Sequence, residues 1–191
     1  MRFKRCYYFN LFLWVIKMEL KEVKYLGGIG AILNLVSYAV GGILAIVGYI
    51  LILIALNKIS KIFNDDEVFK KYLYGIILWI VAVLIAIFAV GISFISLLFS
   101  SLDYGLMAVS SFLIGIMLFY ILLVIGSYFI KKSYEKVSYY TDVDSFRICG
   151  LLYFIGTILL IVIVGVVVII IAQVLEIVAY FSLPDDLRIE N

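Results

Sequence analysis

The chain is dominated by four long apolar stretches separated by short polar segments. Each stretch exceeds the roughly 20 residues that an α-helix needs to cross the hydrocarbon core of a membrane. Runs such as Ile158–Ile171 lack the alternation of apolar and polar residues that is typical of membrane β-barrels. This pattern predicts membrane-spanning helices. The stretches are Leu26–Leu56, Tyr72–Phe99, Tyr104–Ile130 and Ile148–Leu183.

The first and last stretches are too long for a single ordinary crossing. As one helix, Leu26–Leu56 would extend about 46 Å at about 1.5 Å per residue, against a hydrocarbon core of about 30 Å. Gly41-Gly42 lies near its midpoint, and Gly165 lies near the midpoint of Ile148–Leu183. Each stretch is therefore either one strongly tilted, kinked helix or a hairpin of two helices, which are short enough to be re-entrant.

Basic residues gather in two linkers, at residues 57–71 and 131–147, whereas the segment between the two middle stretches carries only Asp103. If each middle stretch crosses once, both linkers lie on one side of the membrane, and their lysines predict that this side is cytoplasmic. Lys21 and Lys24 favour the same side for the start of the first stretch. We therefore expect an all-α polytopic transmembrane helical bundle of six helical segments in the cell membrane, with four long tilted helices as the alternative.

The two basic linkers resemble each other. Residues 58–75 contain Lys-Ile-Ser, Phe-Asn-Asp and Phe-Lys, and residues 136–150 contain Lys-Val-Ser, Tyr-Thr-Asp and Phe-Arg in the same order. One deleted residue aligns them, which indicates a weak internal repeat. The Asn, Asp and Thr residues of both linkers are typical of N-caps for the helices that follow.

Composition restricts the class of protein. Of the 191 residues, 66% are hydrophobic and 15% are charged, so a soluble domain of this length could not bury the apolar surface. We expect a single membrane-embedded bundle over residues 18–184 and a polar tail over residues 185–191. Residues 1–17 are expected to be a non-native N-terminal extension, with an interfacial anchor or a signal-like segment as alternatives, because their apolar run is too short to span.

Charge and residue types exclude several chemistries. The net charge of +2 indicates no basic surface for nucleic acid, and histidine, the commonest metal ligand and general base, is absent. No phosphate loop, dinucleotide fingerprint or nucleophile elbow is present. The linker acids suit a divalent cation, but we expect them to form ion pairs with neighbouring lysines and Arg147. These acids are Asp65, Asp66, Glu67, Asp142 and Asp144. We therefore expect no enzyme activity, catalytic residue, metal site or cofactor.

Small residues recur every seven positions in both terminal stretches. Seven residues are nearly two helical turns, so each set lies along one helix face. Small residues allow membrane helices to approach closely, and we expect these faces to pack against neighbouring helices. The two sets are Gly41, Gly48 and Ala55, and Gly165, Ala172 and Ala179.

Few polar side chains interrupt the apolar stretches. Glu176 lies inside the last stretch, with Gln173 one turn earlier on the same face, and Asn34 faces the same direction as Gly41. A carboxyl group in lipid suits proton coupling or cation binding, although Glu176 is near enough to Pro184 to lie at the interface. For Asn34 we expect a structural hydrogen bond between helices. Tyrosines near the ends of the stretches, including Tyr72 and Tyr180, are typical of interfacial belts.

Three segments of the chain resemble a known family. They are Leu26-Gly27-Gly28-Ile29-Gly30-Ala31-Ile32-Leu33, then Ile54-Ala55-Leu56-Asn57-Lys58-Ile59-Ser60 running into Asn64-Asp65-Asp66, and finally Ile177-Val178-Ala179-Tyr180-Phe181-Ser182-Leu183-Pro184. Together they are similar to an archaeal family of multi-pass membrane proteins catalogued as domain of unknown function 996. The resemblance covers roughly residues 20–184 and implies no particular activity.

Two functions remain open from the sequence. The scarcity of intramembrane polar groups favours a non-enzymatic structural or regulatory module that associates through its small-residue faces with a second copy or another membrane protein. The internal repeat and the glycine-broken stretches favour a small transporter or channel for an ion or small solute, because transporter sites often lie where helices are discontinuous. The first hypothesis is preferred at this point, with the lipid bilayer as the other expected partner.

Overall fold

The computed structural model describes residues 2–98 and 102–184, with side chains described for residues 19–96 and 109–184. These residues form six α-helices and no β-strand, and helices α2 to α6 include five spans long and apolar enough to cross a membrane. The predicted all-α bundle of six segments is therefore confirmed, and the alternative of four long helices is wrong. The elements are α1 (Arg2–Ser37), α2 (Ile43–Ile62), α3 (Asp66–Leu98), α4 (Leu102–Thr141), α5 (Asp144–Ile158), the 3₁₀-helix η1 (Leu159–Val162) and α6 (Val164–Phe181).

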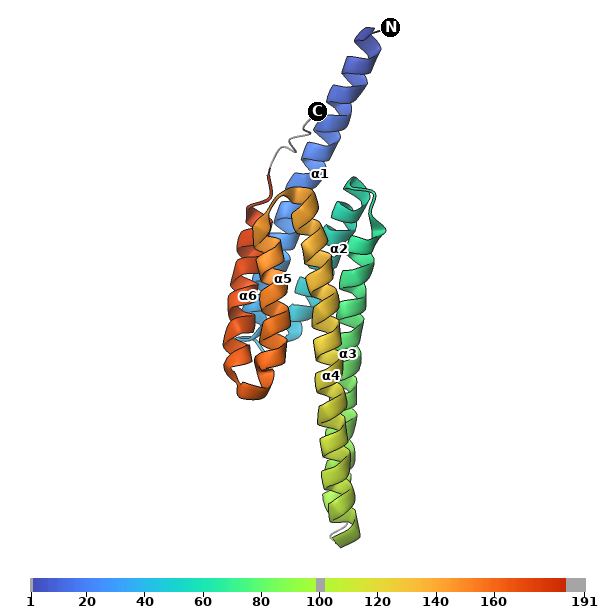
Figure 1. The fold of residues 1–191 in the computed structure, drawn as a ribbon, viewed down its shortest axis with the longest axis vertical. Coiled ribbons are helices and arrows are strands. Elements are labelled where there is room, and N and C mark those ends of the chain that lie inside the picture. Colours follow the sequence, from blue (N-terminus) through green and yellow to red (C-terminus); the bar gives the residue numbers. More distant parts are fainter. Residues whose placement is uncertain (1, 99–101, 185–191) are drawn as a thin grey trace.

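The six helices form a closed ring. Each helix packs against its neighbours in the chain, and α6 packs back against α1. The turns of the hairpins α1–α2 and α5–α6 end part-way along the antiparallel pair α3 and α4, which extends well beyond them (Figure 1). At about 1.5 Å per residue, the 33 residues of α3 extend about 50 Å, whereas the 18 residues of α6 extend about 27 Å. The long pair exceeds a hydrocarbon core of about 30 Å, and α6 falls slightly short of it.

The first hairpin turns at Gly41 and Gly42, as the sequence predicts. Both glycines have positive φ, +77° and +87°, a left-handed conformation that costs glycine little because it has no Cβ. The Gly42 N–H donates to the Ser37 carbonyl at 2.8 Å, which closes the end of α1. The turn exists because two consecutive residues tolerate this backbone geometry.

The second hairpin does not break at Gly165, so that expectation is wrong in position. The chain leaves α5 through η1 and reverses at Ile163, whose φ is +63°, and Gly165 already lies in the first turn of α6. A Cβ at Gly165 would meet the Gly156 carbonyl and the backbone of η1. Gly165 is therefore small because α5 and α6 approach closely beside the turn.

The two linkers share a backbone conformation, in agreement with the weak repeat. α2 and α4 each end before a residue with positive φ, Asn64 at +52° and Asp142 at +55°. The ring of Phe63 in the first linker stacks on Tyr140 of the second, with centroids 4.9 Å apart. Asp65 caps α3 by accepting the Glu67 N–H at 2.9 Å, but Val143 precedes α5 and supplies no side-chain cap, so the predicted second cap is wrong.

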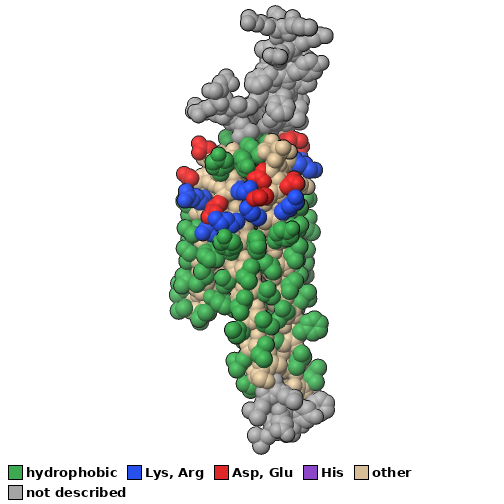
Figure 2. Space-filling model, turned by 45° about the vertical axis from the view of Figure 1, so that its right-hand side comes forward, with side chains coloured by type: hydrophobic (Ala, Val, Ile, Leu, Met, Phe, Trp, Pro, Cys, Tyr) green, Lys and Arg blue, Asp and Glu red, His purple; other side chains and the backbone are tan. Residues whose placement is uncertain are grey.

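The surface divides into a charged band and an apolar region. Lysine, arginine and acidic side chains gather at the linker end, and apolar side chains cover the surface beyond them (Figure 2). Large apolar residues such as Ile43, Phe88, Met117 and Ile161 are exposed on several helices. This distribution suits a lipid environment, in which exposed apolar side chains carry no penalty. Residues 185–191 and the Asp103 side chain lie outside the described residues.

Candidate polar site inside the bundle

Glu176 is the centre of a buried polar layer. Its side chain is 1% exposed, although the sequence allowed an interfacial position. The Tyr134 hydroxyl of α4 donates to one carboxyl oxygen, and the Tyr153 hydroxyl of α5 donates to the other at 2.6 Å. The carboxyl group thus joins three helices, because the face of α6 that carries Ala172 and Ala179 turns Glu176 into the ring.

Among the residues that the structure describes, no cationic side chain forms an ion pair with Glu176. The ion pairs of the described residues lie in the charged band and involve other acids. Its surroundings are aromatic: the Tyr72 ring lies 5.6 Å from that of Tyr134, and the Trp79 ring lies 6.3 Å from that of Tyr153. Burying an ionised carboxylate without a counter-charge costs several kcal/mol. The two tyrosine hydroxyls that donate to Glu176 are therefore the main groups that stabilise a charge there.

A separate polar pocket of about 300 Å³ lies beside the turn of the first hairpin. Residues of α1, the turn, α2 and α6 line it, so the pocket lies at the hairpin end that is away from the linkers. Its polar groups are amides and hydroxyls, and no charged side chain lines it. The lining residues are Asn34, Ser37, Tyr38, Gly41, Gly42, Ala45, Tyr49 and Gln173.

Two amide side chains in this pocket have buried atoms without hydrogen-bond partners. Asn34 and Gln173 are each 2% exposed. Neither the nitrogen nor the oxygen of the Asn34 amide has a partner, and neither has the oxygen of Gln173. The Gln173 nitrogen donates to the Tyr38 hydroxyl at 3.0 Å. Because an unpartnered buried polar group costs about 1–3 kcal/mol, these atoms are the places where a polar ligand would gain most.

The pocket and the carboxyl group belong to one polar layer. Gln173 lies one turn before Glu176 on the same face of α6. Tyr49 lines the pocket, and its ring contacts that of Trp79, which in turn contacts the ring of Tyr153. The structure thus brings together all three polar residues singled out in the sequence, two of them at the pocket and one behind it.

The sequence missed the tyrosines of this layer. Tyr72 and Tyr180 were assigned to an interfacial belt, but they are 2% and 0% exposed, so that assignment is wrong. Tyr180 lies four residues after Glu176, on the same helix face, which is a spacing that could have revealed its position. No comparable signal links Tyr134 or Tyr153 to Glu176, because these residues come from other helices.

The small-residue faces lie within the chain. Ala55, Ala172 and Ala179 are fully buried. Gly48 faces Gly30 so closely that a Cβ on Gly48 would lie 2.7 Å from the Gly30 carbonyl oxygen. The remaining two glycines lie at the hairpin turns. Gly165 packs against α5, but a Cβ added at Gly41 would meet no atom within 4 Å, so the assignment of Gly41 to helix packing is wrong.

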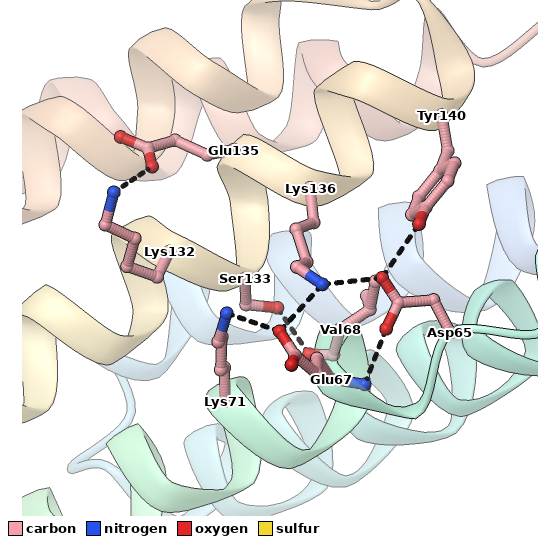
Figure 3. A network of polar contacts seen from close by, with 9 residues as sticks. All are labelled: Asp65, Glu67, Val68, Lys71, Lys132, Ser133, Glu135, Lys136 and Tyr140. Carbon is pink, nitrogen blue, oxygen red and sulfur yellow. Dashed lines mark hydrogen bonds and ion pairs between the residues drawn. The ribbon is translucent and has the colours of Figure 1, made fainter.

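Ion pairs join the two linkers (Figure 3). Lys136 of α4 lies 2.7 Å from Asp65 and 2.7 Å from Glu67, and the Tyr140 hydroxyl donates to Asp65 at 2.8 Å. Lys71 pairs with Glu67 at 2.7 Å. Within the described part of the chain, no group of three or more His, Cys, Asp or Glu side chains could hold a metal ion.

Acid should weaken the clamp between the linkers. The Lys136 ammonium, helped by the Tyr140 hydroxyl, lowers the pKa of the Asp65 carboxyl from 3.8 to about 2. The folded state then binds fewer protons than the unfolded state, so its stabilisation is complete above the unfolded pKa and disappears as the pH falls toward about 2. Thermal unfolding measured from about pH 5 down to about pH 2 should show this decline.

A matched pair of variants isolates this contribution. Asp65→Asn should flatten the decline between about pH 4 and about pH 2, because the titrating group is gone. Asp66→Asn, at an exposed neighbour that pairs with Lys70, should leave it in place. An unchanged acid profile in Asp65→Asn would contradict the assignment to this carboxyl group.

Comparison with known proteins adds a family and a relative. Residues 44–174, more than half of the chain, match the family described as Protein of unknown function (DUF996). The chain is 84% identical over 177 residues to an uncharacterized protein of Methanocaldococcus jannaschii, and the match covers 93% of this chain and 100% of the relative. No solved structure matches the chain.

Proposed function

The chain belongs to the family described as Protein of unknown function (DUF996), as the sequence segments indicated, and we propose that it is a small transporter or channel. The observation that carries the proposal is the half-open polar pocket with the unpartnered amide of Asn34 and the unpartnered amide oxygen of Gln173. A pocket of about 300 Å³ is the size of a small-molecule site. Its amide and hydroxyl groups suit a small neutral solute or a cation, and no basic group is present to hold an anion.

The alternative of a structural module that associates through its small-residue faces has less support. Ala55, Ala172 and Ala179 are buried against helices of the same chain, so these faces are occupied. The discontinuities at Gly42 and Ile163 favour transport, because backbone that leaves a helix at membrane depth usually lines a cavity. We expect binding and passage rather than a reaction, since the pocket offers no general base or activated nucleophile.

The proposed orientation follows from the charged band. Lysines of both linkers lie at one end of the bundle, and the positive-inside rule assigns this end to the cytoplasm. Lys58 follows Gly42 by 16 positions, which correspond to about 24 Å along α2 at about 1.5 Å per residue. The pocket would then lie in the outer half of the membrane.

Flux into liposomes tests the proposal. We expect the purified protein to pass at least one member of a panel of monovalent cations and small neutral solutes faster than protein-free liposomes do. Asn34→Leu and Gln173→Leu should each lower this flux at least about ten-fold, because about 1.4 kcal/mol of lost ligand bonding corresponds to that factor. Val174→Leu, beside Gln173 but on the exposed face of α6, is the control. Flux equal to protein-free liposomes across the panel, or unaffected by either amide variant, would refute the proposal.

Glu176→Gln distinguishes a cation from a neutral solute. A carboxyl group behind the pocket lowers the energy of a cation through its charge, and this effect is stronger in a low-dielectric interior than in water. The variant should therefore lower the flux of a cation and leave that of a neutral solute unchanged. Parallel flux measurements with both probes on the same liposomes provide the comparison.

A further inference from the structure

An apolar groove runs between α2 and α3 on the membrane-facing surface. It has a volume of about 470 Å³, and side chains from both helices line it. Ile46, Ile50, Ile80 and Val83 are each about half exposed or more, so the groove is open to the surroundings. The lining consists of Ala45, Ile46, Tyr49, Ile50, Leu53, Ile76, Trp79, Ile80, Val83 and Leu84.

The chemistry of the groove excludes a polar occupant. Its surface is almost entirely apolar, and the Trp79 indole N–H already donates to the Leu123 carbonyl at 3.2 Å. A polar ligand would lose its hydration there without gaining hydrogen bonds. The occupant must therefore be an apolar chain or an apolar surface.

The size of the groove favours a thin occupant. A membrane-spanning helix about 10 Å wide and about 30 Å long fills on the order of 2,000 Å³. The groove offers about 470 Å³, a small fraction of that volume. A helix of a second copy could cover the groove but could not enter it, whereas a flexible hydrocarbon chain can.

The charge above the groove identifies the kind of lipid. Lys61 follows Ile50 by 11 residues, close to three full turns, so it lies on the groove side of α2 about 16 Å nearer the charged band. Among the described residues, Lys58, Lys70 and Lys71 each pair with an acid, but no acid pairs with Lys61. A lysine at this level attracts the phosphate of an anionic lipid.

We propose that the α2–α3 groove binds one hydrocarbon chain of an anionic membrane lipid, whose headgroup is held by Lys61. Tyr49 lines both the groove and the polar pocket, so the lipid chain supports one wall of that pocket. The lipid site rests on the groove and Lys61, and it does not require the protein to be a transporter.

Fluorescence of Trp79 tests the site directly, because this side chain lines the groove. Trp14→Phe leaves Trp79 as the single tryptophan. The protein is reconstituted in phosphatidylcholine vesicles with increasing fractions of phosphatidylglycerol. In one series phosphatidylcholine carries brominated chains, which quench a neighbouring indole, and in a second series phosphatidylglycerol carries them. We expect saturable quenching, with a higher apparent affinity for phosphatidylglycerol. Equal quenching by the two lipids would overturn the headgroup assignment, and absence of quenching would overturn the site.

Matched variants separate chain binding from headgroup binding. Val83→Phe narrows the groove and should lower the quenching at least about two-fold, whereas Val90→Phe, seven residues further on the same exposed face and outside the groove, should not. Ile50→Phe narrows the opposite wall and repeats the test if Val83→Phe does not fold, as judged by circular dichroism. Quenching unchanged in both narrowed variants would overturn the proposal.

The lysine variants complete the experiment. Lys61→Gln should lower the preference for phosphatidylglycerol about five-fold, the equivalent of about 1 kcal/mol for one lysine near the surface. Lys70→Gln should change it less, because Lys70 already pairs with Asp66. Val83→Cys tests whether a second copy of the chain covers the groove instead. Efficient disulfide cross-linking between two chains would show that it does and would overturn the lipid assignment.

Discussion

Glu176→Ala should strongly destabilise the protein in detergent micelles or lipid nanodiscs. The variant leaves the hydroxyls of Tyr134 and Tyr153 without their acceptor, at 0% and 6% exposure. Each orphaned buried hydroxyl costs about 1–3 kcal/mol, and the cavity left by the side chain adds to this. Thermal unfolding followed by circular dichroism measures the loss.

Two further variants distinguish lost hydrogen bonds from lost volume. Glu176→Gln keeps the shape and retains an acceptor oxygen, so it should cost less than Glu176→Ala. The combination of Glu176→Leu with Tyr134→Phe and Tyr153→Phe removes donors and acceptor together, which is often nearly neutral. We expect the triple variant to be more stable than Glu176→Leu alone. If the added phenylalanines instead lower stability further, the hydroxyls are not held by this carboxyl group.

Gly48→Ala should destabilise the first hairpin, because α1 and α2 are in contact there through their backbones. The added methyl group would lie 2.7 Å from the Gly30 carbonyl oxygen and would also meet the Asn34 side chain, so the helices would have to separate. Overpacking of this kind typically costs about 1–3 kcal/mol. Since Asn34 lines the polar pocket, ligand flux should fall as well.

Gly91→Ala is the matched control for this prediction. Gly91 lies inside α3, and a Cβ at its position would meet no atom within 4 Å. Alanine favours helix over glycine by about 1 kcal/mol, so the variant should be neutral or slightly stabilising. The two substitutions are chemically identical, but only Gly48→Ala should lower the temperature of thermal unfolding. Equal effects would show that the α1–α2 approach is looser than the structure indicates.

The two hairpin turns show which backbone features the local sequence can predict. Consecutive glycines permit positive φ without steric cost, so the break at Gly41 and Gly42 was predictable from the residues themselves. The second turn carries no such signal, because Ile163 adopts a positive φ that its own side chain disfavours. Packing of α5 against α6 imposes that turn, and the midpoint glycine instead marks their close approach.

At the pocket, too, some residues were predictable from the sequence and others were not. Asn34, Gln173 and Glu176 were recognisable because a polar side chain in an apolar stretch is expensive and therefore conspicuous. Their partners were not, since hydrogen bonds such as Tyr153 to Glu176 join residues of different helices. Only the closure of the ring from α1 to α6 brings the amides of α1 and α6 to one cavity.

The sequence by itself determined that the protein is a helical membrane bundle with its basic linkers on one side, and it favoured six segments over four. These properties follow from runs of apolar residues, their lengths and the distribution of charge, all of which are local. The tertiary structure decided where Glu176 lies, which tyrosines bond it and that Asn34 and Gln173 share a pocket. Such contacts depend on how separate helices rotate and approach one another, and helical periodicity assigns a residue to a face without specifying the helix that it meets.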